Sequence, residues 1–199
     1  MSQALIAAAG RGDAAEVRRL LAEGAEVNAR DARGRTALLA ATHAGDAEAA
    51  RLLIDAGADL DLQDAILDNP FLYAGAQGRL EILKLLIAAG ADAKRTNRYG
   101  GVALIPASEK GHAETVRTLL ETTDVDVNHV NNLGWTALLE VAILSDGGPR
   151  HQEIARLLLQ HGADPRLADR DGVTALRHAE RNGLTEIARI LRGAEPGAR

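Results

Sequence analysis

The chain has 199 residues, of which 46% are hydrophobic and 26% are charged, and its formal net charge is −5. This apolar fraction is ample for a folded core and the charged fraction is ordinary, so the composition excludes an intrinsically disordered chain. The acidic balance argues against nucleic-acid binding, which needs a basic stripe that neutralises phosphates. Cysteine is absent, which excludes disulfides, thiolate zinc sites and a cysteine nucleophile.

No stretch of the chain approaches the roughly 18 consecutive apolar residues that a membrane-spanning helix needs. The amino terminus has a short apolar stretch with no basic residue before it, and it therefore makes a poor signal peptide. We expect a monomeric cytoplasmic protein that binds neither membranes nor nucleic acid.

A repeat with a period of 33 residues runs along the chain. Glycines recur at this spacing, at Gly12, Gly45, Gly78 and Gly111, and again at Gly183 after two periods and six residues. A Gly-Ala-Asp/Glu triplet begins at Gly24, Gly57, Gly90 and Gly162, and a Gly-x-Thr-Ala-Leu segment begins at Gly34, Gly134 and Gly172. Three independent landmarks that share one period indicate a repeat architecture.

The second unit shows what each repeat is expected to form. Thr36 can cap a short helix over residues 37–42, and Gly45 can end that helix in the left-handed conformation. A second helix is predicted over residues 47–56, with Gly57 as its stop. In the third unit the apolar face of the second helix is expected from Leu80, Leu83, Leu86 and Ile87, which have helical spacing. Each unit is then a helix, a turn, a helix and a hairpin-like loop, and so small a unit must stack on its neighbours.

The period, the Thr-Ala-Leu-Leu slot and the Gly-Ala-Asp loop resemble the ankyrin repeat across essentially the whole chain. The resemblance implies an all-α solenoid of about six helix–turn–helix–hairpin units with capping terminal repeats. We place the units at residues 1–30, 31–63, 64–96, 97–130, 131–168 and 169–193, in a single domain over residues 1–193, with residues 194–199 as a flexible tail. The alanine- and arginine-rich usage is typical of a bacterial member of this family.

The sequence departs from the consensus of that family in two ways. The slot that usually holds histidine is occupied by Leu39, Leu72, Ile105, Leu139 and Arg177, so the consensus threonine–histidine hydrogen bonds are not expected. One extra residue lies near residues 122–125, and about five more lie around residues 145–149. Insertions in repeat proteins project as loops, and Gly-Gly-Pro is turn chemistry, so the longer insertion is expected to form a protruding elbow after the first helix of repeat five.

The resemblance implies a non-catalytic protein–protein interaction module that needs no cofactor or metal and uses a concave face of hairpin tips and inner helices. The sequence has only four aromatic residues. Phe71 and Tyr73 are explained mainly by packing, whereas Tyr99 and Trp135 map to neighbouring hairpin tips with Ile66 and Leu133. Such an exposed apolar strip has the composition of a binding hot spot. The candidate partner-binding residues are Arg33, Arg35, Ile66, Arg98, Tyr99, Asn132, Leu133, Trp135 and Asp171. Alternatively, Leu133 and Trp135 fold back and pack on a neighbouring hairpin.

The inserted loop allows a different function. Its residues Ser145, Asp146, Gly147, Gly148, Arg150 and His151 could bind an anion or small molecule through free backbone amides and arginine. Glu140 and His178 occupy the same slot in adjacent repeats, and with Asp146 and His151 they could form a hydrolytic carboxylate–imidazole cluster or a weak metal site. A tolerated insertion and a charged pair in the groove are the simpler interpretations, because no metal-ligand or nucleophile motif occurs. A third possibility is a structural role through self-association of an end repeat.

Overall fold

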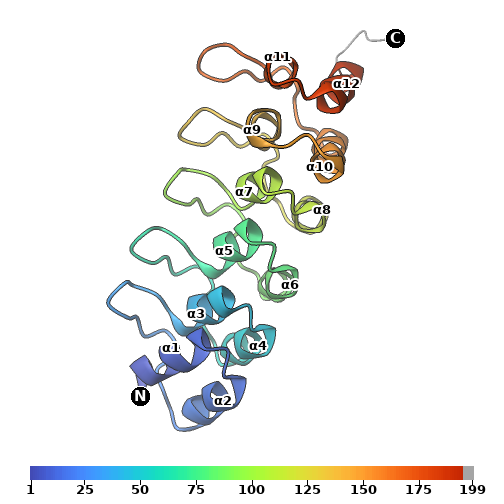
Figure 1. Cartoon of the computed structure of the whole chain (residues 1–199). Helices are drawn as coiled ribbons and strands as arrows, with labels where there is room; N and C mark the ends of the chain where they lie inside the picture. The colour runs from blue at the N-terminus through green and yellow to red at the C-terminus, as the bar shows by residue number, and fades with distance from the viewer. Residues whose placement is uncertain (195–199) are drawn as a thin grey trace. The chain divides into compact units, whose positions relative to one another are not determined.

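The structure is a computed structural model that describes residues 1–194 of the chain. Over these residues the chain forms twelve α-helices and no strand, and one isolated β-bridge joins Ala168 to Thr174. The helices follow one another in six pairs, with a hairpin loop between each pair and the next (Figure 1). The all-α class and the six helix pairs predicted from the sequence are confirmed.

We call the first helix of each pair inner, because it lies next to the hairpin loops, and the second outer (Figure 1). The inner helices are α1 (Ser2–Gly10), α3 (Ala37–Ala44), α5 (Pro70–Ala76), α7 (Leu104–Glu109), α9 (Ala137–Leu144) and α11 (Ala175–Arg181). The outer helices are α2 (Ala14–Ala22), α4 (Ala47–Asp55), α6 (Leu80–Ala88), α8 (Ala113–Thr122), α10 (Pro149–Gln160) and α12 (Thr185–Ala194).

The chain divides into two compact units. The first comprises residues 1–75 and 79–98, and the second comprises residues 76–78 together with the chain from residue 99 onward. In the first unit α1 packs on α3, while α2 packs on α4 and α4 on α6. In the second unit α9 packs between α7 and α11, and α10 packs between α8 and α12. Each unit is thus two layers of helices, as stacked repeats require. The single domain over residues 1–193 stays a prediction.

The carboxyl-terminal boundary differs slightly from the expected one. Helix α12 continues through Ala194, a residue that the sequence pattern places in the tail. The rest of the predicted tail, residues 195–199, lies outside the described residues.

Local capping explains where the inner helices begin and end. The Thr36 hydroxyl accepts a hydrogen bond from the Leu39 amide at 3.2 Å, and Gly45 ends α3 with a φ of 75°, as predicted. The Thr136 hydroxyl accepts from the Leu139 amide in the same way. The expected bounds were off by one or two residues, because α3 runs to Ala44 and α4 stops at Asp55.

The predicted apolar face of α6 is only partly correct. Leu83 and Leu86 are buried, but Leu80 and Ile87 are only half-buried, and the buried stripe includes Ile82 instead. The packed face of a short outer helix is narrow, so residues at its margins keep contact with solvent.

The two aromatic residues assigned to packing do pack in the first unit. Phe71, on α5, is 1% exposed and fills the slot that Leu38 fills one repeat earlier. The ring of Tyr73 stacks on the ring of His43 from α3, with centroids 3.8 Å apart and an interplanar angle of 13°. The Tyr73 ring therefore joins α5 to α3, and neither aromatic side chain is needed to explain binding.

The start of α5 contains a buried hydrogen-bond donor that has no partner. Asn69 takes the place of the capping threonine, and its side-chain oxygen accepts a hydrogen bond from the Leu72 amide at 2.8 Å. The residue is fully buried and its Nδ2 atom has no hydrogen-bond partner. We expect Asn69→Thr to stabilise the protein by about 1 kcal/mol, because it keeps the cap and removes a buried unsatisfied donor. Urea denaturation followed by circular dichroism measures the change.

The reverse substitution in the second repeat is the matched control. Thr36→Asn places the same amide at an equivalent cap that is 2% exposed, and it should lower the unfolding free energy. Equal effects of the two variants in the same direction would show that the orphan donor is not the cause.

The longer insertion does not form the protruding elbow that the sequence predicted. The connection between inner and outer helix has two residues in repeat two (45–46) and four residues in repeat five (145–148). Helix α10 has 12 residues, whereas α4 has 9. Most of the added chain therefore extends the outer helix, and Pro149 starts it at a position where proline is favoured.

Candidate partner-binding surface

Each of four hairpin loops is built around one Asp or Asn side chain. In the loop of residues 31–35, Asp31 Oδ1 accepts hydrogen bonds from the amides of Arg33 and Arg35 at 2.8 and 3.0 Å. The same pair of bonds, to the residues two and four positions on, is made by Asp64, Asn131 and Asp169. Such side-chain turns fix a short loop without a sheet, so the backbone of each tip is held in place.

One tip has an unusual backbone. The fourth position of the hairpins is a glycine with positive φ at Gly34, Gly100, Gly134 and Gly172. In the hairpin of residues 64–68 this position is Leu67, with a φ of 59°, and within residues 1–194 it is the one non-glycine residue with positive φ. A left-handed conformation costs a side-chain-bearing residue roughly 1–2 kcal/mol.

Exposed apolar side chains gather on the hairpins of both units. In the first unit Ile66 and Leu67 are 50% and 49% exposed, and in the second unit Tyr99, Val130 and Leu133 are between 51% and 56% exposed. The Asn132 amide donates to the Tyr99 carbonyl at 2.8 Å, so the loops that hold Tyr99 and Leu133 are neighbours. The strip proposed from the sequence is divided between the two units, and its continuity stays a prediction.

Trp135 does not lie on a tip, contrary to the expectation. It stands four residues after Asn131, and its amide donates to that side chain at 3.1 Å at the base of the hairpin. It immediately precedes the Thr136 cap of α9 and is half-buried. Its partial burial fits the alternative interpretation, whereas the exposure of Leu133 fits the binding interpretation.

The charged and polar candidates have different roles. Arg35 braces its own hairpin, because its guanidinium pairs with Asp31 at 2.7 Å and is only 30% exposed. Asn132 holds the next loop, since its carbonyl accepts from Arg170 at 2.6 Å. Arg33, Arg98 and Asp171 are exposed. Whether any of these residues touches a partner stays a prediction.

The inserted loop uses its own polar groups internally. The Gly147 amide donates to Ser145 Oγ at 3.1 Å, and the Gly148 amide donates to Asp146 Oδ1 at 2.8 Å. The bond from the Gly148 amide, together with the nearby His151, lowers the pKa of the Asp146 carboxyl. The amides that an anion would need are therefore already satisfied by the loop.

His151 joins the loop to the preceding repeat. Its Nδ1 lies 2.8 Å from Asp146 Oδ1, and its Nε2 lies 2.8 Å from the carbonyl oxygen of Glu109 at the end of α7. Added side-chain atoms at Gly111 would come within 3.3 Å of the ring. The ring thus covers the end of the inner helix, as His112 covers Gly78 one repeat earlier, and its role is structural.

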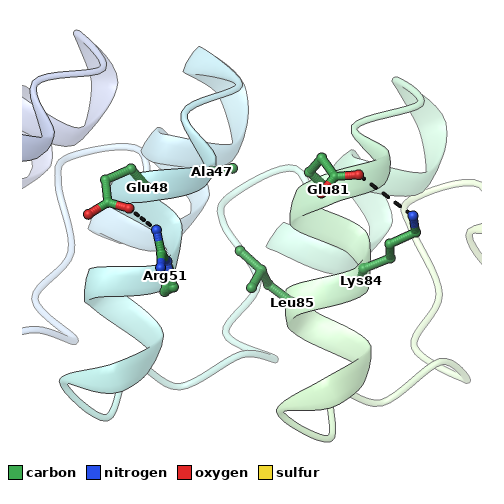
Figure 2. Close-up of a pocket in the computed structure, with 6 residues that line it drawn as sticks. All are labelled: Ala47, Glu48, Arg51, Glu81, Lys84 and Leu85. Carbon is green, nitrogen blue, oxygen red and sulfur yellow. Dashed lines mark hydrogen bonds and ion pairs between the residues drawn. The ribbon is translucent and has the colours of Figure 1, made fainter.

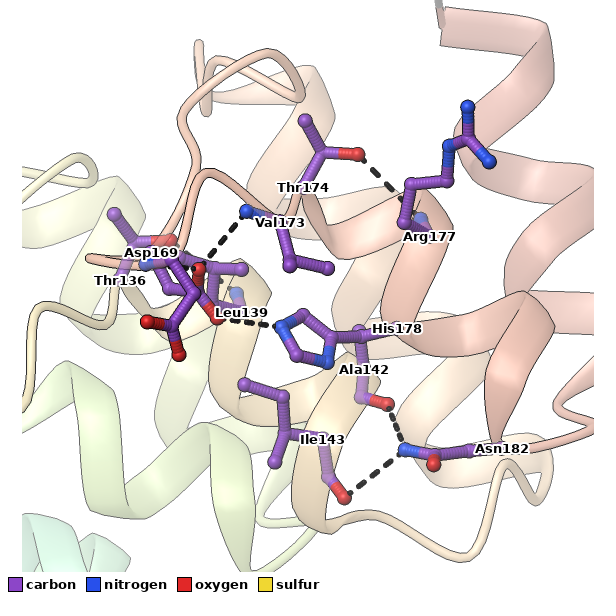
Figure 3. Close-up of polar contacts among 11 residues, drawn as sticks. Thr136, Leu139, Ala142, Ile143, Asp169, Val173, Thr174, Arg177, His178 and Asn182 are labelled. Carbon is purple, nitrogen blue, oxygen red and sulfur yellow. Dashed lines mark hydrogen bonds and ion pairs between the residues drawn. The ribbon is translucent and has the colours of Figure 1, made fainter.

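Glu140 and His178 do not face each other as a catalytic pair. His178 lies 2.7 Å from Asp169 Oδ2 within its own repeat, and Asn182 donates to the carbonyls that end α9 (Figure 3). Glu140 accepts a hydrogen bond from Asn131 Nδ2 at 2.9 Å and is 5% exposed. Burial, with a smaller effect from Glu109, raises the pKa of Glu140 to about 7. Within residues 1–194 no group of three or more His, Asp or Glu side chains is placed to hold a metal ion.

The outer helices present a groove of a different kind. Between α4 and α6 a shallow groove of about 340 Å³ is lined by Ala47, Glu48, Arg51, Glu81, Lys84 and Leu85 (Figure 2). Arg51 pairs with Glu48, and Lys84 lies 3.6 Å from Glu81. Exposed pairs of this type contribute little to stability, and because they neutralise each other they leave the groove without a charge that would select a ligand.

Leu67 and Val130 are exposed apolar residues that the sequence pattern does not predict. The sequence does contain a signal for Leu67. The other hairpins have a glycine at this position, and the hairpin of residues 64–68 has a leucine. No comparable signal existed for Val130, whose 51% exposure depends on how its hairpin leaves the stack.

No helix within residues 1–194 has both the length and the apolar character needed to cross a membrane.

Comparisons with known proteins identify the fold. The family model described as ankyrin repeats in three copies matches residues 2–64, 71–169 and 125–199. A solved ankyrin repeat domain from Acinetobacter baumannii AYE is 53% identical with a TM-score of 0.91, and 96% of each chain is covered. The solved ankyrin repeat protein EF0377 is 44% identical with a TM-score of 0.92, over 96% of this chain and 97% of the other.

Two further relatives are informative. A chain in the structure of the predatory endopeptidase Bd0816 from Bdellovibrio bacteriovorus, in complex with the immunity protein Bd3460, is 27% identical with a TM-score of 0.78, over 98% of this chain and 99% of that one. The ankyrin repeat protein YahD of Escherichia coli (strain K12) is 51% identical over 94 residues, which is 47% of each chain. The chain thus spans about half the length or less of the first curated relatives it matches. On the family match and the agreement of the solved structures, the chain belongs to the ankyrin repeat family.

Proposed function

We propose that the chain is a protein-binding module that engages its partner through the hairpin tips and the adjacent inner helices. The observation that carries this proposal is the exposure of large apolar side chains on the hairpins, above all Leu133, whose amide is held by Asn131 Oδ1, and Tyr99, whose carbonyl accepts from the Asn132 amide of the next hairpin. Aromatic and aliphatic side chains on a rigid support bind with little loss of conformational entropy.

The family supports the same conclusion at a coarser level. Ankyrin repeats are in general non-catalytic modules for protein–protein interaction. One of the similar structures contains a complex with an immunity protein. The anion or hydrolytic alternative lacks support, because the loop amides, Glu140 and His178 are each engaged in separate internal hydrogen bonds. A cytoplasmic location, a monomeric state and a bacterial source stay predictions from the sequence.

Replacing both Tyr99 and Leu133 by alanine should weaken partner binding at least tenfold while leaving the fold intact, because both side chains are more than half exposed. The measurement is quantitative affinity capture from cells that express the chain, followed by titration of the recovered protein. Trp135 is a poorer probe, since its half-buried ring contributes to packing and its loss would change stability and binding together.

Leu144→Ala is the matched control. Leu144 is 50% exposed in the same unit, but it ends α9 instead of lying on a hairpin. If the double variant and Leu144→Ala retain the same proteins with the same affinity, the hairpin tips of the second unit are not the binding surface.

A further inference from the structure

The hairpin of residues 131–135 is tied to its inner helix by one side chain. Asn131 is 7% exposed, and its Oδ1 accepts hydrogen bonds from the amides of Leu133 and Trp135 at 2.9 and 3.1 Å. Its Nδ2 donates to Glu140 Oε1 at 2.9 Å. The Asn131 side chain thus joins the loop that exposes Leu133 to a carboxyl group in the first turn of α9.

The corresponding side-chain atom has a different partner in two other hairpins. In repeat two the second oxygen of Asp31 pairs with Arg35, and an arginine keeps its charge over the whole physiological pH range. In repeat six the second oxygen of Asp169 lies 2.7 Å from His178 Nε2. Of these three hairpins, the one in repeat five alone has a carboxyl group as the partner, so its bond to the helix depends on the state of an acid.

The surroundings of Glu140 disfavour its charged form. The residue is 5% exposed, and within residues 1–194 no cationic side chain forms an ion pair with it. Helix α9 packs on α7, α10 and α11. On α7, Glu109 contributes a like charge. On α11, His178 is bonded to Asp169, and on α10, His151 is bonded to the Glu109 carbonyl. The hairpin of residues 131–135 itself carries no charged residue.

Burial is the largest influence on this carboxyl group. It raises the pKa of Glu140 to about 7, although the hydrogen bond from Asn131 acts in the opposite direction. Ionisation of a buried carboxyl costs free energy that is recovered when the carboxylate reaches water. Movement of Glu140 toward water removes the acceptor of Asn131 Nδ2, and the Asn131 amide then loses the contact that orients it toward the backbone of its hairpin.

We propose that Glu140 is a proton-dependent latch for the hairpin of residues 131–135, which holds the hairpin against α9 while the carboxyl group is neutral and releases it on ionisation. The consequence for binding rests on the proposed protein-binding function. Leu133 is 53% exposed on this hairpin, and a released loop must be ordered again when a partner binds, which lowers the affinity. Binding through Leu133 therefore weakens as the pH rises through 7.

Amide hydrogen exchange of the full chain, measured by NMR at pH 6 and pH 8, tests the latch without a partner. If opening exposes Glu140, a pKa of about 7 in the closed hairpin and the ordinary 4.5 in the open one make opening about tenfold more favourable at pH 8 than at pH 6. The protection factors of the Leu133 and Trp135 amides should fall by this factor. Those of the Arg33 and Arg35 amides, which Asp31 holds in the same way, should stay constant.

Three variants separate Glu140 from other titrating groups. Glu140→Gln should abolish the pH dependence at Leu133 and Trp135, whereas His178→Gln should preserve it. The double variant Asn131→Asp, Glu140→Gln exchanges the amide and the carboxyl between the two positions. It keeps a hydrogen bond between hairpin and helix without a buried acid on α9, so its protection factors at these two amides should be equal at pH 6 and pH 8.

Unchanged protection of Leu133 and Trp135 between the two pH values would overturn the latch. So would a fall that persists in Glu140→Gln, or one that Arg33 and Arg35 share, because the cause would then lie in another group or in the whole fold. Each of these results leaves the proposed function standing, since the measurement involves no partner and the affinity of the Tyr99 and Leu133 double variant tests binding separately.

Discussion

Replacement of Phe71 by alanine is expected to lower the free energy of unfolding by about 3–5 kcal/mol. Phe71 is the single phenylalanine of the chain and, at 1% exposed, one of its largest fully buried side chains. Removing a buried aromatic ring loses its transfer free energy and leaves a cavity that the short helices around it can fill only in part. Because typical domains are stable by only about 5–15 kcal/mol, this change is a large fraction of the total. Urea denaturation monitored by circular dichroism is the measurement.

Phe71→Leu is the control for this prediction, because the equivalent residues Leu38, Leu104 and Leu138 are buried leucines. A change of hydrophobic shape of this kind costs less than about 1.5 kcal/mol when the neighbours can repack. If alanine and leucine destabilise the protein equally, the cost arises from loss of an aromatic contact and not from the cavity.

Glu140→Gln is expected to stabilise the protein by about 2–3 kcal/mol at pH 8 and to have little effect near pH 4. Burial raises the pKa of Glu140 from 4.5 to about 7 in the folded protein, so the folded state binds a proton that the unfolded state has already lost. Stability therefore falls as the pH rises from about 4.5 to 7, and the full penalty applies above that range. Glutamine removes the charge and can still accept the hydrogen bond from Asn131.

The measurement is the unfolding free energy of wild type and variant across this pH range. Glu114→Gln provides the control, because that side chain is 69% exposed on α8, and its difference from wild type should be small and independent of pH. A constant difference for Glu140→Gln across the range would show that Glu140 does not titrate between these values.

The parts of the fold that repeat could be predicted from the sequence, and the parts that occur once could not. Thr36 and Gly45 begin and end a helix through local backbone geometry. The 33-residue recurrence of such residues therefore predicts the helix bounds to within two residues. The inserted segment has no counterpart in other repeats. Its division between a longer connection and a longer α10 depends on the carbonyl that His151 reaches in the preceding repeat. Pro149 was nevertheless a usable signal for the start of that helix.

The candidate surface was predicted less well, because exposure depends on tertiary surroundings that the repeat pattern does not describe. The positions of Ile66, Tyr99 and Leu133 within their repeats predict that they lie on hairpins, and all three residues are about half exposed. Register alone could not place Trp135, because the base and the tip of a hairpin are only two residues apart and differ in tertiary surroundings. The raised pKa of Glu140 was also beyond sequence reasoning, since it depends on burial and on Glu109 from another repeat.

The Asp- and Asn-centred loops have a consequence for how this chain can change. Each one fixes its backbone through bonds to the second and fourth residues that follow, which use main-chain amides and not side chains. The side chains at the second and third positions of each hairpin take no part in these bonds, whereas the fourth position favours glycine. New recognition properties can therefore arise by exchange of those two side chains, while the rest of the loop and the helices beneath it are inherited unchanged.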